Sequence, residues 1–212
     1  MKVAIIGASG NIGSAIRDEA LSRGHQVTAI VRNPEKITIQ NEALTVVKGD
    51  VLEGRVDELV KGNDAVISSY NPGWGLEEMH DITIEAYDSI ISGAKKAGIR
   101  LLVVGGAGSL EASPGVQVID TMDVPPNIKG AILGLREVLY TLRKETGLDW
   151  TFLSPAANIA SGERTGKFRL GKEQLVKDEA GESKISTQDY AIAMIDELEK
   201  PQHSGQRFTL AY

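Results

Sequence analysis

The chain has 212 residues, 42% of them hydrophobic and 25% charged, which suits one sizeable globular core. The net charge of −6, with Lys and Arg scattered along the chain, argues against a nucleic-acid or anionic-membrane surface. The absence of cysteine excludes disulfides, thiol nucleophiles and thiolate metal sites, and it fits a reducing cytosol. The opening apolar run ends at Gly7 and no later run reaches membrane-spanning length, so we expect a cytoplasmic protein.

Short apolar runs alternate along the chain with longer amphipathic segments, as in a parallel sheet covered by helices on both faces. The expected strands are residues 2–6, 26–32, 44–49, 64–70, 99–106, 149–154 and 207–212. Gly24, Gly98 and Gly147 each follow basic residues and precede a strand, which is a typical helix stop. The pattern predicts an α/β fold, a Rossmann doubly wound parallel sheet of about seven strands.

Residues 155 to about 186 depart from this alternation, because they are polar and contain several glycines. They lie between the sixth expected strand and a last helix expected over residues 187–199. We assign them to a small substrate lobe at the carboxyl edge of the sheet, where such folds bind their ligands. The whole chain, residues 1–212, then forms a single domain.

The stretch "GASGNIG" places three glycines directly between the first strand and the first helix. Gly7 suits the tight turn, Gly10 lets the backbone approach a pyrophosphate, and Gly13 allows close packing of helix on strand. The amides at the helix start would face the phosphates. A simple strand-to-helix turn is the alternative to a dinucleotide site. The predicted cofactor residues of this loop are Gly7, Ser9, Gly10, Asn11, Ile12 and Gly13.

The end of the second strand bears on which dinucleotide binds. An NAD-specific site usually carries Asp or Glu there, whereas this chain has Arg32 and Asn33. Arg32 suits a 2′-phosphate and Ser9 adds a hydroxyl, so we expect NADP(H) to be preferred over NAD(H). If Arg32 is solvated or only stacks on adenine, NADH would serve as well. Asp50 and Val51 would flank the adenine, unless Asp50 caps a turn or helix.

The stretch "YTLRK" has the Tyr-Lys spacing that short-chain dehydrogenases use for catalysis. Its helix is expected to begin near Asn127, at the carboxyl edge of the sheet. Tyr140 follows 13 residues later, roughly 20 Å down the helix and away from the cofactor. We therefore interpret this pair as structural, with Leu139 and Leu142 on the packed face.

Several stretches together resemble one family: "KVAIIGASGNIGSAI", "GHQVTAIVRNPEKI", "VVGGAGSL", "DWTFLSPAA", "GERTGKFRLG" and the closing segment from "ISTQDYAIAM" onward. They are similar to the NAD(P)H-flavin reductases, atypical short-chain dehydrogenases related to the flavin-reducing biliverdin reductases. The resemblance spans nearly the whole chain and implies an NAD(P)H-dependent oxidoreductase.

Extended relatives carry a catalytic Ser-Tyr-Lys set, and this chain departs from it at two of the three positions. The resemblance puts the catalytic Lys near Lys129, but Pro125 stands where the Tyr would be. Gly105, Gly106 and Ala107 occupy the place of the catalytic Ser. Alcohol dehydrogenation, epimerisation and dehydration are therefore doubtful, and Lys129 is only a weak catalytic candidate.

Reduction of a carbonyl needs a positioned proton donor, and the sequence offers none of good quality. Reduction of a flavin needs less, because the ring delocalises the charge and water can supply the proton. We therefore expect FMN, FAD or riboflavin as a substrate rather than as a tightly bound group. A non-catalytic NAD(P)-binding redox sensor is the main alternative, and a small-carbonyl reductase that uses Lys129 and water is a weaker one.

Residues at the carboxyl ends of the later strands are candidates for the nicotinamide and acceptor. The further cofactor candidates are Ser68, Ser69, Gly105, Gly106 and Pro155. The acceptor candidates are Trp74, Ala156, Asn158 and Arg164. Trp74 as a packing residue, Pro155 as a strand terminator and Arg164 as a solvated charge remain alternatives.

Two other patterns carry no site. "GERTGKF" resembles a phosphate-binding P-loop, but it has three residues rather than four between Gly162 and Gly166, and Phe168 replaces the Ser or Thr that holds magnesium. The three histidines lie far apart with no carboxylate at ligand spacing, so we expect no metal. The expected partner is a small-molecule acceptor, not a nucleic acid or a membrane, and the expected state is a monomer or homodimer.

Overall fold

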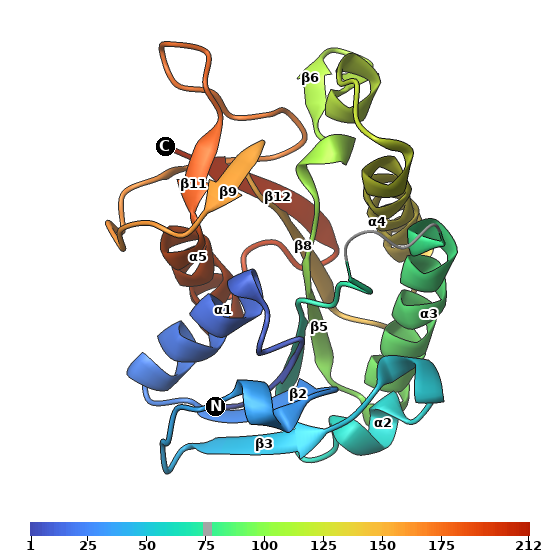
Figure 1. The fold of residues 1–212 in the computed structure, drawn as a ribbon, viewed down its shortest axis with the longest axis vertical. Helices are drawn as coiled ribbons and strands as arrows, with labels where there is room; N and C mark the ends of the chain where they lie inside the picture. Colours follow the sequence, from blue (N-terminus) through green and yellow to red (C-terminus); the bar gives the residue numbers. More distant parts are fainter. Residues whose placement is uncertain (74–77) are drawn as a thin grey trace.

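The computed structural model describes residues 1–73 and 78–212, which form an α/β fold around one eight-stranded sheet (Figure 1). The strand order across the sheet is β10-β12-β8-β5-β4-β1-β2-β3. The strands are β1 (Lys2–Ile6), β2 (Gln26–Val31), β3 (Leu44–Lys48), β4 (Ala65–Ser68), β5 (Arg100–Val104), β8 (Trp150–Ser154), β10 (Arg169–Gly171) and β12 (Gln206–Ala211). All neighbours pair in parallel except β10, which runs antiparallel to β12. The prediction of a doubly wound Rossmann-type sheet is confirmed.

Helices cover both faces of the sheet. The helices are α1 (Asn11–Ser22), α2 (Val56–Leu59), α3 (Met79–Ala97), α4 (Pro126–Lys144) and α5 (Thr187–Glu199). Short 3-10 turns follow several strands, namely η1 (Pro34–Lys36), η2 (Val51–Glu53), η3 (Ala107–Ser109) and η4 (Val118–Thr121). In Figure 1, α1 and α5 lie side by side on one face, and α3 and α4 on the other. Each face buries its own apolar layer, one around Tyr190 and Phe208, the other around Tyr87 and Phe152.

The local stop signals behave as the sequence predicts. Gly24, Gly98 and Gly147 have positive φ angles of 80°, 67° and 87°, a backbone conformation that residues other than glycine rarely adopt. Gly98 is the C-cap of α3 and Gly24 directly follows the C-cap of α1, whereas Gly147 lies three residues after α4 ends; each lets the chain turn back into the sheet. The last helix occupies Thr187–Glu199, the range expected for it.

The count of about seven strands is too low by one, because β10 comes from within the expected lobe and joins the edge of the main sheet. The rest of residues 155–186 contains β9 (Asn158–Ala160) and β11 (Lys184–Ser186), which pair with each other in parallel. A further hairpin of β6 (Glu111–Ser113) and β7 (Val116–Gln117) follows β5. These strands of two or three residues are too short to show an alternating pattern in the sequence. Within the described residues, no helix is long and apolar enough to cross a bilayer.

Candidate functional site

The glycine loop between β1 and α1 is packed so tightly that two of its positions leave no room for a side chain. A Cβ on Gly7 would lie 2.4 Å from the carbonyl oxygen of Ser69, and Gly7 has a φ of 78°. A Cβ on Gly13 would lie 2.1 Å from the carbonyl oxygen of Gly7. The sequence therefore needs glycine at both positions to bring the start of α1 against the end of β1.

The start of α1 presents unpaired backbone donors. Gly10 is the N-cap and gives no side chain to the helix start. Counting only partners in residues 1–73 and 78–212, the amides of Asn11, Ile12 and Gly13 donate no hydrogen bond. These donors and the positive end of the helix dipole form a site that favours an anion such as a diphosphate.

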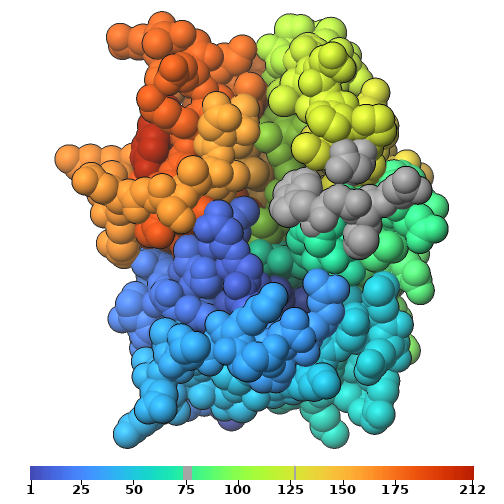
Figure 2. All heavy atoms as spheres, in the orientation of Figure 1, coloured from blue at the N-terminus to red at the C-terminus, as the bar shows by residue number. Residues whose placement is uncertain are grey.

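A hollow of about 230 Å³ opens beside this loop. Figure 2 views the face on which the segments that line the hollow meet, with the blue N-terminal part next to the lighter blue residues near 30–50. Eight predicted cofactor residues line it: Gly7, Ser9, Gly10, Arg32, Asn33, Asp50, Val51 and Ser69. The structure therefore brings together the ends of β1, β2, β3 and β4, which are distant in the sequence.

The rim of the hollow at the end of β2 carries two cations. Arg32 is exposed, and its guanidinium lies 3.5 Å from the carbonyl oxygen of Pro72. Lys36 also lines the hollow, because the turn η1 brings it back toward the end of β2. The sequence reasoning missed Lys36, although a second basic residue four positions after Arg32 is a usable signal. Together the two side chains offer a site for a phosphate group.

Two further residues that line the hollow are Asp50 and Tyr70, and Asp50 also stabilises the local backbone. The Asp50 carboxylate accepts a hydrogen bond of 3.1 Å from the Leu52 amide and so caps η2. This is the capping role that the sequence left open, and Asp50 still borders the hollow. Tyr70 lies on the same wall, and burial raises the pKa of its hydroxyl.

One predicted cofactor contact is wrong for its side chain. Ser68 is fully buried, and its hydroxyl lies 3.3 Å from the hydroxyl of Tyr87 inside the layer beneath α3. The Ser68 hydroxyl donates this hydrogen bond to the Tyr87 oxygen, and burial raises the pKa of the Tyr87 hydroxyl, which stays protonated. The Ser68 hydroxyl is therefore not available to a ribose or nicotinamide, whereas Ser69, one residue later, borders the hollow.

At the carboxyl ends of β5 and β8, three of the four predicted contact residues are also buried. Gly105 is buried, and a Cβ there would lie 2.1 Å from the Phe152 ring, so this glycine serves packing. Gly106 is partly exposed, with Leu135 as its nearest neighbour at 3.6 Å from a Cβ. Pro155 and Ala156 are buried, Ala156 within the core beneath α5, so neither side chain offers a contact surface.

Among the acceptor candidates, Asn158 is exposed at the start of β9. Trp74 lies outside the described residues. Lys129 is exposed in the first turn of α4, and its amide donates to the carbonyl of Pro125. The structure thus keeps Asn158 and Lys129 accessible on segments that follow the carboxyl edge.

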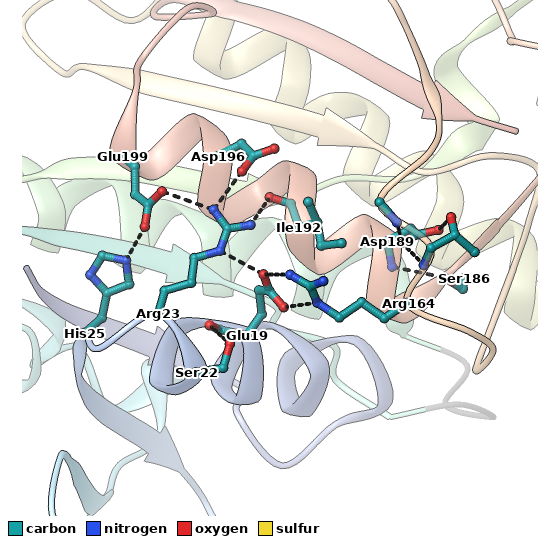
Figure 3. Close-up of polar contacts among 12 residues, drawn as sticks. Glu19, Ser22, Arg23, His25, Arg164, Ser186, Asp189, Ile192, Asp196 and Glu199 are labelled. Carbon is teal, nitrogen blue, oxygen red and sulfur yellow. Dashed lines mark hydrogen bonds and ion pairs between the residues drawn. The ribbon is translucent and has the colours of Figure 1, made fainter.

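Arg164 does not face the acceptor edge and instead forms an ion pair with α1. Its guanidinium donates from Nε and Nη2 to the two oxygens of Glu19, both at 2.8 Å (Figure 3). Glu19 is buried and lies two turns into α1, so the pair joins the segment between β9 and β10 to the middle of that helix. The guanidinium of Arg164 is therefore paired with Glu19 in this arrangement and is not a free charge at an acceptor site.

The sequence matches the NAD(P)H-binding family over residues 7–201. The chain belongs to this family. Three solved structures resemble it over its full length. The "putative epimerase" of Bacteroides thetaiotaomicron is 51% identical, with a TM-score of 0.93 and 96% of that chain covered. A "putative exported protein" of Burkholderia pseudomallei is 42% identical, with a TM-score of 0.88 and all of that chain covered. A "putative NADH-flavin reductase" of Streptococcus pneumoniae is 37% identical, with a TM-score of 0.87 and 99% covered.

Membership of the NAD(P)H-binding family agrees with the geometry of the hollow. The glycine cradle, the unpaired amides of α1 and the cationic rim fit the phosphates of a nicotinamide dinucleotide. Two of the three names state different activities and the third states none, so the names do not fix the reaction of this chain.

The remaining polar patterns serve structure. Tyr140 accepts a hydrogen bond of 2.9 Å from Gln117, and Leu139 and Leu142 are fully buried, as expected for a structural "YTLRK". His80 lies within 3.1 Å of both Asp81 and Glu137; these carboxylates, Asp81 first, raise its pKa. Within the described part of the chain, no three His, Asp or Glu side chains gather in a way that could hold a metal ion.

Proposed function

We propose that the protein is an NADPH-dependent oxidoreductase that transfers a hydride to a free flavin or a similar flat acceptor. The observation that carries the cofactor choice is the rim of the dinucleotide hollow. Arg32 and Lys36 stand there, at the end of the strand where an NAD-specific site has a carboxylate for the ribose. A 2′-phosphate would turn both cations into charge-assisted hydrogen-bond donors.

The choice of acceptor follows from the chemistry at the carboxyl edge. The resemblance puts Gly105, Gly106 and Ala107 where extended relatives carry the catalytic Ser, and Pro125 where they carry the Tyr. A bound dinucleotide would supply the hydride, and this chain would bind and orient the two rings against each other. Because a flavin ring delocalises the added charge, it asks for no strong acid from the protein. The flavin reductase name of one 37% identical structure supports this class of acceptor.

The direct test is the oxidation of NADPH and NADH, followed by absorbance, with FMN, FAD or riboflavin and without flavin. We expect flavin-dependent oxidation, with NADPH used at a lower KM than NADH. If NADPH binds and no flavin accelerates its oxidation, the reductase proposal fails and a redox-sensing role replaces it. If Lys129→Ala leaves the activity unchanged, Lys129 has no part in the reaction.

The cofactor preference has its own variants. Arg32→Ala and Lys36→Ala should each raise the KM for NADPH by about tenfold, corresponding to about 1.4 kcal/mol, and change the KM for NADH much less. Lys61→Ala is the matched control, because it removes an exposed cation at the opposite edge of the sheet, before β4. An equal loss with NADH in the two rim variants would remove the 2′-phosphate role.

Two further expectations complete the proposal. We place the protein in the cytoplasm, because the chain has no cysteine and suits a reducing compartment. We also propose a monomer or homodimer whose partner is the small-molecule acceptor. Cell fractionation with an antibody tests the first, and light scattering coupled to gel filtration tests the second.

A further inference from the structure

An exposed segment between β9 and β10 is fastened at almost every residue. We call residues 161–166, "SGERTG", the clamp loop; every one of its residues is exposed. The fully buried Asp189 of α5 accepts hydrogen bonds from the amides of Thr165 and Gly166, both at 2.8 Å, and from the Thr165 hydroxyl at 2.5 Å. The Ser186 hydroxyl donates to the carbonyl of Glu163 at 2.7 Å. One end of the loop is thus fixed to the start of α5.

A second anchor ties the middle of the clamp loop to α1. The Arg164 fork binds both oxygens of Glu19, a carboxylate whose side chain is only 5% exposed. Arg164 is the strongest influence on this group, and it holds the pKa of Glu19 below its ordinary value. Arg23 binds the same carboxylate from the other side at 2.7 Å, and Figure 3 shows both arginines converging on it.

The first residues of the clamp loop reach the end of α1 that opens toward the dinucleotide. The Ser161 hydroxyl donates to the Asn11 side chain at 3.3 Å, and the Gly162 amide donates to Gln188 at 2.9 Å. Asn11 is the first residue of α1, next to the unpaired amides. Glu19 lies eight residues further, about 12 Å along the helix. The loop therefore runs along α1 from the Arg164 anchor to the phosphate end.

We propose that Arg164 is a positioning residue that holds the clamp loop beside the diphosphate of the bound dinucleotide, so that Ser161 and Asn11 present their polar groups there. The inference rests on the dinucleotide site of the proposed function and is independent of the acceptor. A loop that is fixed before the ligand binds loses less conformational freedom on binding, and the Arg164 fork adds to the contacts with Asp189, Ser186 and Gln188 that fix this one. The fork at Glu19 holds the loop in place beforehand.

The test compares the dissociation constants of NADPH and of 2′-AMP by calorimetry. The fragment 2′-AMP carries the adenosine end and its 2′-phosphate but no diphosphate, so the clamp loop should not affect its binding. We expect Arg164→Ala to weaken NADPH binding about tenfold, about 1.4 kcal/mol, and to leave 2′-AMP binding unchanged. Arg164→Lys keeps the charge but not the fork and should fall between the two proteins.

Arg23→Ala is the matched control. It removes the other arginine from Glu19, together with its bonds to Asp196 and Glu199, without touching the clamp loop. It should lower the unfolding temperature and leave both dissociation constants unchanged. Equal NADPH affinity in the wild type and Arg164→Ala, or equal weakening of NADPH and 2′-AMP, would overturn the positioning role. If the wild type binds NADPH but does not reduce flavin, the proposed acceptor is wrong and the positioning role of Arg164 is unaffected.

Discussion

Replacing Gly13 by alanine probes the closest backbone approach in the candidate site. The new Cβ would lie 2.1 Å from the carbonyl oxygen and 2.9 Å from the carbonyl carbon of Gly7. Both are backbone atoms, so no side-chain rotation can relieve the contact. The start of α1 and the turn at Gly7 would have to separate by about 0.9 Å to reach the 3.0 Å that real Cβ contacts respect.

Two effects of opposite sign set the magnitude. Forcing a methyl group into a closed contact costs about 1–3 kcal/mol. Alanine in place of a helical glycine returns about 0.5–1 kcal/mol, because the unfolded chain has less freedom to lose. The steric term is the larger one, so the net loss is up to about 2.5 kcal/mol. For a chain of this length the unfolding temperature should fall by up to about 10 °C.

Thermal unfolding followed by circular dichroism, with NADPH titration of the folded protein, measures both consequences. We expect weaker NADPH binding as well, since the displaced turn carries the amides that face the diphosphate. Gly130→Ala is the matched control: it is also a helical glycine, and its Cβ would meet its nearest atom at an ordinary 3.5 Å. That variant should be slightly more stable than the wild type. If Gly13→Ala proves as stable as Gly130→Ala, the steric reasoning is refuted.

Two further predictions concern the contacts of α5 and the clamp loop. Ser186→Ala removes the N-cap of α5, whose hydroxyl accepts a hydrogen bond from the Asp189 amide at 2.9 Å, and should lower the free energy of unfolding by about 1–2 kcal/mol. Ser204→Ala, at an exposed position, is the control and should cause no measurable change. Equal unfolding temperatures for the two variants would contradict the capping role. Hydrogen bonds and charge from Arg164 and Arg23 lower the pKa of Glu19 from 4.5 in spite of its burial, so stability present above that value should be lost as the pH falls through the folded pKa. Unfolding temperatures measured from about pH 6 to about pH 3 should fall less steeply in Arg164→Ala than in the wild type, and parallel curves would argue against this pair.

The strands and helices of the main sheet could be predicted because their signals are local. An apolar run, a basic helix end and a glycine such as Gly98 lie within a few residues of one another. The same holds for the cradle of Gly7 and Gly13, whose spacing between a strand and a helix predicts both the turn and the close packing.

The side-chain environments at the carboxyl edge were not predictable in this way. Whether Ser68 faces a ligand or Tyr87 depends on α3, which follows it in the sequence and packs over it. From the sequence alone, Arg164 is an ordinary exposed cation. Its partner Glu19 is 145 residues away in the sequence and comes close only in the folded chain. Lys36 lines the hollow only because the turn η1 directs the chain back toward the end of β2. The strand β10 is too short to show a pattern in the sequence and is recognised only by its pairing with β12.

The sequence by itself thus determined seven strands of the sheet, their alternation with helices along the chain and the place of the dinucleotide loop, because periodicity, glycine spacing and helix stops act over short stretches of chain. Only the tertiary structure decided which polar side chains are accessible and which are already paired. Such pairing depends on contacts between segments that are distant in the chain, and no local pattern encodes the distance between Arg164 and Glu19 or the burial of Ser68 and Ala156.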